Sequence, residues 1–215
     1  MKLPRKNAPW LGWLRELQAI AQTGLCYSEG PYDRERYAQL RELVLHMVEA
    51  HCDLPLGQAQ ALFESEVGPA TPRVDVRGVV LQEDRVLLVR ERSDGCWSLP
   101  GGWADVGESP AQSVVREILE ESGYRARATR LLALHDRDRH NSPPLVYSVY
   151  KLFFACELED EKGPEVSHEP NTEIEAVGFF PLTELPPLSL GRNTAEQIAR
   201  MVELIQTPLS PAEFD

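Results

Sequence analysis

One segment of the chain combines clear helix start and stop signals with a cluster of acidic residues. Ser109 and Pro110 predict the start of a helix, because serine caps helix N-termini and proline is favoured at the first helical position. Gly123 predicts its end. Apolar residues recur between them at helical spacing, namely Ala111, Val114, Val115 and Ile118. The segment is therefore expected to pack one face of a helix on a core.

A second face of the same helix carries three glutamates. Glu117, Glu120 and Glu121 fall at spacings that bring side chains together on a helix, where like charges repel. A hard divalent cation would reverse the sign of that interaction, because it prefers clustered carboxylate oxygens. The Gly101-Gly102 pair lets backbone approach the same place without a Cβ atom. The pattern predicts a divalent metal site; the alternative is a solvated acidic helix face.

The spacing of these residues is similar to a known family signature. Gly102, five residues, Glu108, seven residues and then 116–124 (REILEESGY) resemble the Nudix box, G-x5-E-x7-R-E-U-x-E-E-x-G-U, where U is a bulky apolar residue. Every specified position matches. The preceding WSLPGG, residues 97–102, resembles the W-x-L-P-G-G lead-in common in this superfamily. The resemblance covers roughly residues 72–206.

The Nudix resemblance implies roles for the box residues, carried over position by position. It implies Mg²⁺ or Mn²⁺ as the cofactor, with Glu117 and Glu121 as the favoured ligands and Glu120 as a third. The carbonyl oxygen of Gly102 is a further expected ligand. Glu108 is expected to act from the loop as a weaker ligand or through another ligand. Arg116 is expected to hold a glutamate in place rather than to contact substrate.

The expected chemistry is attack of water on one phosphorus atom of a P–O–P link, assisted by the metal. A carboxylate must accept a proton in that step. In many relatives the base lies on a loop late in the domain, where the candidates are Glu165, Glu169, Glu173 and Glu175. We favour Glu173, because it lies just before a predicted strand. The alternative is a box glutamate such as Glu120.

The N-terminal segment narrows the expected substrate. Residues 13–25 and 31–37 resemble the helical extension of a Nudix subgroup that acts on ADP-ribose, CDP-choline or related nucleoside diphosphate derivatives, written NDP-X. Hydrolysis of (d)NTPs or of an RNA 5′ end is the alternative enzyme activity. A ligand-sensing regulator that kept the fold is disfavoured, because the box is intact and the chain is acidic.

Other residues are candidates for contacts with substrate. Arg137 and Arg139 follow a predicted strand and are expected to bind a distal phosphate, as His140 also could; the alternative is a polar turn. Four aromatic residues are candidates for stacking on a base, although core packing is the favoured role for those in strands: Trp103, Tyr147, Phe153 and Phe154.

The chain is expected to form an α/β fold with two parts. Residues 1–68 predict a helical subdomain with helices near 9–23, 32–51 and 57–67, and the Gly/Pro-rich stretch 68–72 predicts a boundary. Residues 72–206 are expected to form a Nudix-type mixed sheet in an α/β/α sandwich, followed by a flexible tail at 207–215. The expected strands span 74–81, 86–90, 96–100, 131–135, 145–158 and 177–180, with helices at 110–121 and 193–206.

The composition of the chain limits the classes of molecule that it is expected to bind. The formal net charge of −12 disfavours bulk nucleic acid and anionic membranes. No apolar run approaches the roughly 18 residues of a membrane span. The four cysteines form no CxxC pair, which favours reduced thiols in a cytoplasmic protein. The helical subdomain carries more apolar surface than it can bury alone, and the subgroup resemblance also implies dimers, so we expect a homodimer that uses these helices.

Overall fold

The computed structural model describes residues 9–51, 68–140, 142–143, 145, 147–159 and 173–215. Its contacts divide the chain into two compact units. The first comprises residues 1–72 together with 143–148, and the second comprises 73–142 together with 149–215. No helix within the described ranges has both the length and the apolar character needed to cross a bilayer.

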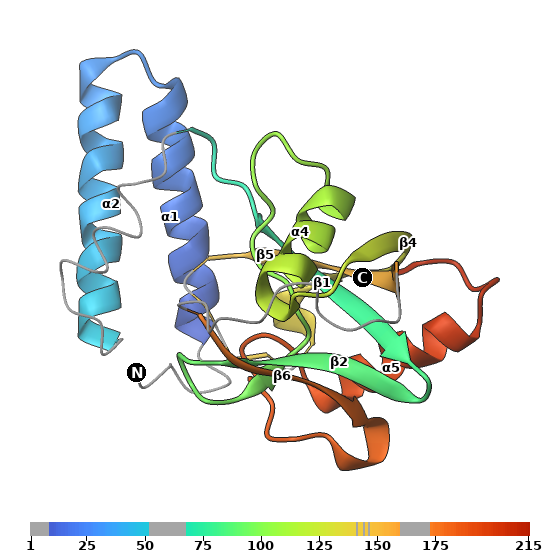
Figure 1. The fold of residues 1–215 in the computed structure, drawn as a ribbon. Coiled ribbons are helices and arrows are strands. Elements are labelled where there is room, and N and C mark those ends of the chain that lie inside the picture. The colour runs from blue at the N-terminus through green and yellow to red at the C-terminus, as the bar shows by residue number, and fades with distance from the viewer. Residues whose placement is uncertain (1–8, 52–67, 141, 144, 146, 160–172) are drawn as a thin grey trace. The chain divides into compact units, whose positions relative to one another are not determined.

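The first unit is built on two helices that lie side by side, α1 (Pro9–Tyr27) and α2 (Pro31–His51) (Figure 1). Their shared core consists of Leu14, Val44 and Val48. The expected helix end at Gly24 is wrong, because α1 continues to Tyr27. Gly24 instead leaves room for α2: a Cβ atom there would lie 2.4–2.5 Å from the ring of Tyr37. The helix expected near 57–67 lies outside the described residues.

The second unit contains one mixed sheet. Its strands are β1 (Arg73–Gln82), β2 (Arg85–Glu91), β3 (Trp97–Ser98), β4 (Ala126–Asp136), β5 (Val149–Leu158), β6 (Ile174–Pro181) and β7 (Glu213–Phe214). They follow the order β3-β2-β1-β5-β4-β7, and β6 pairs with the second side of β2. The pairs β1–β5 and β4–β7 are parallel and the others are antiparallel.

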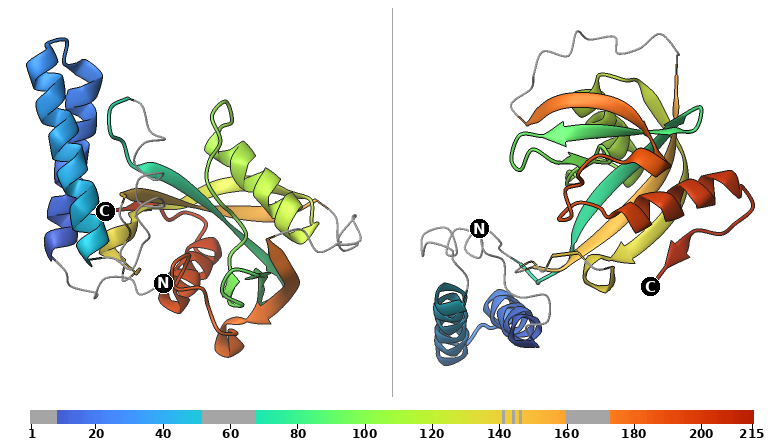
Figure 2. Two further views of the ribbon diagram at one scale, coloured as in Figure 1. Left: turned by 90° about the vertical axis from the view of Figure 1, so that its left-hand side faces the viewer. Right: turned by 90° about the horizontal axis from the view of Figure 1, so that it is seen from below.

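Helices cover the two faces of this sheet. The remaining elements are α4 (Pro110–Ser122), α5 (Ala195–Gln206) and two short 3-10 turns, η1 (Arg137–Arg139) and η2 (Leu182–Glu184). Val114 and Ile118 of α4 pack on a cluster that includes Val76 of β1. Ile198 and Met201 of α5 pack on the cluster that holds Val79 of the same strand. Because strand side chains alternate between faces, α4 and α5 lie on opposite sides of the sheet (Figure 2), which confirms the predicted α/β sandwich.

Several elements of the second unit differ in extent from the sequence expectation, most of all β4, β5 and the C-terminal segment. Strand β4 begins at Ala126, five residues earlier than expected, and β5 begins only at Val149. The segment after α5, for which a flexible tail was expected, carries β7 paired with β4. Arg130 of β4 also donates hydrogen bonds to backbone carbonyl oxygens of this segment, including that of Pro208 at 2.9 Å.

Candidate active site

The box helix α4 has the caps that its sequence predicts. Ser109 and Gln112 form a reciprocal capping box at its N-terminus. Gly123 closes the helix in the left-handed conformation with φ of 74°, and its N–H donates to the carbonyl oxygen of Leu119. The buried stripe of Val114 and Ile118 then fixes the rotation of the helix on the sheet. These local features position the acidic face of α4.

The three box glutamates differ in exposure. The side chain of Glu120 is 57% exposed, that of Glu117 is 15% exposed, and Glu121 is buried at 6%. One carboxylate oxygen of Glu121 accepts a hydrogen bond from the backbone N–H of Gly101 at 2.8 Å. Glu121 therefore reaches from the helix to the glycine loop, which the sequence pattern placed near it.

The glycine loop has one position at which a side chain would not fit and a second at which it would crowd a carboxylate. Gly101 has φ of +141°, and a Cβ atom there would lie 2.0 Å from the carbonyl oxygen of Val76. A Cβ atom on Gly102 would lie 3.0–3.1 Å from the carboxylate of Glu117. The carbonyl oxygen of Gly102 accepts from the N–H of Val76 at 2.8 Å, which ties the loop to β1. Backbone and carboxylate oxygens thus come close together at this loop.

Arg116 lies at the centre of the acidic cluster. Its guanidinium forms ion pairs with Asp105 at 3.0 Å, Glu108 at 3.2 Å, Glu117 at 2.9 Å and Glu120 at 3.0 Å. Arg116 thus contacts two box glutamates, Glu117 and Glu120, and the expected role of holding them in place stays a prediction. Asp105 is an additional carboxylate here that sequence analysis did not single out.

Burial sets the protonation behaviour of the site. Burial raises the pKa of Glu121 to about 8, although the nearby Arg77 guanidinium and the Gly101 N–H act in the opposite direction. Burial also raises the pKa of Glu117, against the attraction of Arg116. The pKa of Glu108 is lowered, mainly by the hydrogen bond from the Ser113 hydroxyl. A cation at the site would therefore compete with a proton for the carboxylate of Glu121.

The donor chemistry of the site fits a hard divalent cation, because its oxygens come from carboxylates and a backbone carbonyl. Within the described residues, however, no three acidic, histidine or cysteine side chains converge as a ready-made ligand set. The guanidinium of Arg116 pairs with Glu117 and Glu120 instead. Binding of a cation would require Glu117 to exchange its contact with Arg116 for the ion.

The structure describes two of the four candidate bases from outside the box. Glu173 is exposed and directly precedes β6, and its backbone carbonyl accepts from the N–H of Arg92 at 2.8 Å. Glu175 lies on β6 and pairs with Arg90 at 3.5 Å. The other two candidates, Glu165 and Glu169, lie outside the described residues.

The residues expected to bind phosphate differ in their exposure. The side chain of Arg137 is buried and donates to the carbonyl oxygen of Gly191, whereas that of Arg139 is 70% exposed and lies 3.7 Å from Asp136. His140 contacts Asp215 at 2.9 Å.

The aromatic candidates for stacking on a base lie in two environments. Phe153 and Phe154 belong to the core, whereas Trp103, directly after the glycine loop, is 44% exposed.

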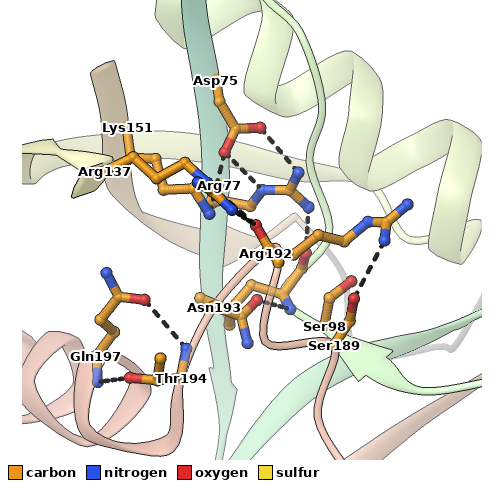
Figure 3. Close-up of polar contacts among 12 residues, drawn as sticks. Asp75, Arg77, Ser98, Arg137, Lys151, Ser189, Arg192, Asn193, Thr194 and Gln197 are labelled. Atoms are coloured by element: carbon orange, nitrogen blue, oxygen red, sulfur yellow. Dashed lines mark hydrogen bonds and ion pairs between the residues drawn. The ribbon is translucent and has the colours of Figure 1, made fainter. Parts of the chain in front are cut away.

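Sequence analysis missed a buried polar group next to the loop, shown in Figure 3. Asp75 and Arg77 of β1 form a two-point ion pair with distances of 2.8 and 3.2 Å, and Arg77 also donates to the carbonyl oxygen of Leu99 at 3.1 Å. Lys151 of β5 lies 3.4 Å from Asp75. The available signal was charged residues at alternate positions within an apolar strand, which places them on one face.

Comparison with known proteins assigns the family. The NUDIX domain model matches residues 71–201. The chain belongs to the Nudix hydrolase family. Residues 8–63 match a second family model, described as a UDP-X-like, N-terminal oligomerisation domain. Family models thus match both the Nudix domain and the helical extension of this Nudix hydrolase, as the sequence resemblance indicated.

Two proteins similar to this Nudix hydrolase match it over nearly its full length, and a third matches about two thirds of it. It is 42% identical over 206 residues to the Bacillus subtilis protein YjhB, to which ADP-ribose pyrophosphatase activity is assigned provisionally; the match covers 96% of this chain and 97% of that protein. A solved structure of a UDP-X diphosphatase is 34% identical, with a TM-score of 0.61 over 96% of this chain and 98% of the other. An ADP-ribose pyrophosphatase from Streptococcus suis is 43% identical, with a TM-score of 0.60, over 67% of this chain and 100% of its own.

Proposed function

We propose that this Nudix hydrolase cleaves the pyrophosphate link of a nucleoside diphosphate joined to another moiety, NDP-X, by attack of water at phosphorus. The observation that carries the proposal is the meeting of Glu117 and Glu121 with the Gly101-Gly102 loop. The names of the full-length relative and of the similar UDP-X diphosphatase structure support NDP-X as the substrate class. ADP-ribose and CDP-choline are the two compounds to test first.

The cofactor in this proposal is Mg²⁺ or Mn²⁺. Glu117, Glu121 and the Gly102 carbonyl would hold it, with Glu120 as a third carboxylate and Glu108 as a weaker one. When bound, such an ion neutralises phosphate oxygens and lowers the pKa of the attacking water. Support comes from the oxygen-only donor set and from the buried Glu121 and half-buried Glu117, whose pKa values are raised by burial.

The chain's own groups then have distinct tasks. Arg116 orients Glu117 and Glu120 through its ion pairs, so we assign it a positioning role. We propose Glu173 as the general base, since its backbone is fixed at the start of β6 by the hydrogen bond to Arg92. Glu120 is the alternative base within the box.

We propose that Arg137 binds a phosphate of the substrate. Its burial in the second unit supports this role, because a charge-assisted hydrogen bond to phosphate is stronger away from water. Arg139 was a candidate for the same role, and its exposure makes it the weaker one.

A substrate panel tests the proposed activity. Purified protein with Mg²⁺ or Mn²⁺ is incubated with ADP-ribose, CDP-choline, a UDP-sugar and dNTPs, and the products are separated by chromatography. Cleavage of an NDP-X compound to a nucleoside monophosphate and a phosphorylated X is the expected result. Preferential release of pyrophosphate from dNTPs would support the alternative activity instead.

We also propose that the protein is a homodimer through its N-terminal helices. Trp13, Ile20 and Tyr27 recur every seven residues on α1, and they are 62%, 53% and 70% exposed. On the neighbouring α2, Tyr32 and Leu43 are exposed as well. A stripe of large apolar side chains at this spacing suits the pairing of helices. The match of residues 8–63 to an oligomerisation domain supports this proposal.

The compartment that we propose is the cytoplasm. Support comes from the wide spacing of the cysteines along the chain and from Cys26, Cys96 and Cys156, which are free thiols.

A further inference from the structure

The face of the sheet covered by α5 carries a row of buried polar residues that the box chemistry does not use. Asp75 of β1 pairs in register with Lys151 of β5, which in turn pairs with His135 of β4. All three side chains are at most 5% exposed. Partners directly opposite each other on neighbouring strands point to the same face. The row therefore gathers charged and titratable groups at one end of an otherwise apolar layer.

Lys151 is the least satisfied member of this row. Its ammonium nitrogen lies 3.4 Å from one oxygen of Asp75, and it makes no well-aligned hydrogen bond to any residue that the structure describes. Asp75 already accepts two hydrogen bonds from Arg77. Burial lowers the pKa of Lys151 to about 7, although Asp75 acts in the opposite direction. A buried ammonium has three N–H donors, so an acceptor is expected beside it.

A second buried cation lies near Lys151. Arg137 of η1 is 3% exposed, and its positive charge helps to lower the pKa of Lys151, after burial. Figure 3 shows the side chains of Lys151 and Arg137 extending toward the Asp75–Arg77 pair. Arg137 donates to the carbonyl oxygen of Gly191 at 3.2 and 3.4 Å, and Asp138 lies 3.9 Å from it. Because a charged oxygen is a stronger acceptor than a carbonyl, an anion would replace Gly191 at this guanidinium.

Lys151 lies on the strand next to β1, and β1 binds the glycine loop. Arg77 donates to the carbonyl oxygen of Leu99 at 3.1 Å. Asp75, two residues earlier on β1, is the ion-pair partner of Lys151. The N–H of Val76 between them holds the carbonyl of Gly102 at 2.8 Å. Since neighbouring strands lie about 4.8 Å apart, Lys151 on β5 is roughly one strand spacing from β1, to which the loop is hydrogen-bonded. One substrate molecule can span that distance.

We propose that Lys151 and Arg137 form an anion subsite that binds a phosphate group of the substrate, on the α5 side of the glycine loop. Phosphate suits the pair because it offers oxygens in several directions, to the compact ammonium from β5 and to the planar guanidinium from η1. His135, in register beside Lys151, has a buried Nδ1 without a hydrogen-bond partner among the described residues and supplies a further polar group. The subsite rests on the proposed function only for the identity of the molecule that carries the phosphate.

Binding of inorganic phosphate tests the subsite apart from catalysis. The full-length Glu121→Gln protein is titrated with phosphate by calorimetry in the presence of EDTA, so that neither a metal ion nor turnover contributes. In this background, Lys151→Met and Arg137→Met are each expected to weaken phosphate binding by about 10- to 100-fold, the loss expected for one charge-assisted hydrogen bond. Arg127→Met removes an exposed arginine that pairs with Glu157, and it should leave binding unchanged.

The thermal midpoint of each variant shows separately whether it folds. Lys151→Met removes one buried charge, but Asp75 keeps its two hydrogen bonds from Arg77, so the variant is expected to fold, and its thermal midpoint checks this. Lys151→Gln is the second variant if the methionine variant unfolds. The proposal is overturned if the Glu121→Gln protein binds no phosphate, or if the Lys151 and Arg137 variants bind it as tightly as their parent.

Kinetics with ADP-ribose then separate this proposal from the proposed function. Lys151→Met is expected to raise KM more than it lowers kcat. If phosphate binding depends on Lys151 but no NDP-X compound is cleaved, the subsite stands and the proposed substrate class fails. If NDP-X is cleaved and both variants keep the wild-type KM and phosphate affinity, the proposed function stands and the subsite is refuted.

Discussion

The carboxylate of Glu121 accepts a hydrogen bond from the backbone N–H of Gly101 at 2.8 Å, and this contact joins the box helix to the glycine loop. Gly101 reaches the contact only in a left-handed conformation, with no room for a Cβ atom against Val76. The loop and the helix therefore depend on each other for their positions. Substitutions on either side should disturb the same carboxylate.

Gly101→Ala is expected to lower both stability and turnover. The new methyl group would meet the carbonyl oxygen of Val76 and would have to adopt a positive φ, which together cost about 2–4 kcal/mol of unfolding free energy. Urea unfolding measures the loss. Gly12→Ala is the matched control, because nothing lies within 4 Å of a Cβ atom there and alanine favours a helix. Equal stability of the two variants would contradict the account of the loop.

The stability of the metal-free protein should fall as pH rises from about 4.5 to 8. The pKa of Glu121 is raised to about 8 in the folded state, from an ordinary value of 4.5, so the folded protein binds more protons than the unfolded chain within this window. Glu121→Gln should remove the larger part of this pH dependence, leaving that of Glu117, and should stabilise the metal-free protein at pH 8 by a few kcal/mol. Urea unfolding in EDTA at pH 5, 6.5 and 8 measures the effect.

Two comparisons control that experiment. Glu120→Gln removes a charge from the exposed part of the same helix and should retain the wild-type slope. Addition of Mg²⁺ should restore wild-type stability at pH 8, since the ion favours the charged carboxylate. Parallel slopes for wild type and Glu121→Gln would show that this carboxylate is not protonated in the folded state.

Glu173→Gln is expected to lower kcat far more than Glu165→Gln or Glu169→Gln, with little change in metal affinity. The reason is that a general base must be held in place, and the backbone of Glu173 is fixed beside β2 by its hydrogen bond to Arg92. Steady-state kinetics on the three variants give the answer. A loss no greater than in the other two would move the base elsewhere, with Glu120 as the next candidate.

Sequence reasoning succeeded where local chemistry decides structure. Ser109, Pro110 and Gly123 set the ends of α4 through contacts within a few residues, so its bounds were predicted to within one residue. The hairpin of β1 and β2 likewise follows from a short polar turn between two apolar runs. Helical spacing also brings Arg116, Glu117 and Glu120 into contact, while the metal site expected from the box residues stays a prediction.

Contacts between distant parts of the chain could not be predicted from local sequence patterns. Gly24 looked like a helix stop, but the ring of Tyr37 on the other helix explains it. Residues 145–148 looked like the start of a strand, yet Arg15 of α1 donates to the carbonyl of Leu145 at 2.8 Å, and β5 begins later. The buried row of Asp75 and Lys151 depends on the register between β1 and β5, which no local pattern specifies.

Charged substitutions on the exposed stripe of α1 should separate the proposed dimer. Sedimentation equilibrium at micromolar protein is expected to give a dimer for wild type and a monomer for the Trp13→Glu/Ile20→Glu double variant, because charges at a buried interface are costly. Leu209→Glu places the same charge at a residue that is 98% exposed in the C-terminal segment and should remain dimeric. A strictly monomeric wild-type protein would refute the dimer.

The most direct test of the central claim is turnover of ADP-ribose by Glu121→Gln at saturating Mg²⁺, measured beside Mn²⁺ binding to the same protein. The account predicts a folded variant that binds Mn²⁺ more weakly than wild type and whose kcat is lower by several orders of magnitude, because a metal-ligand carboxylate at the glycine loop has been removed. Near-normal turnover with unchanged Mn²⁺ affinity would contradict the account.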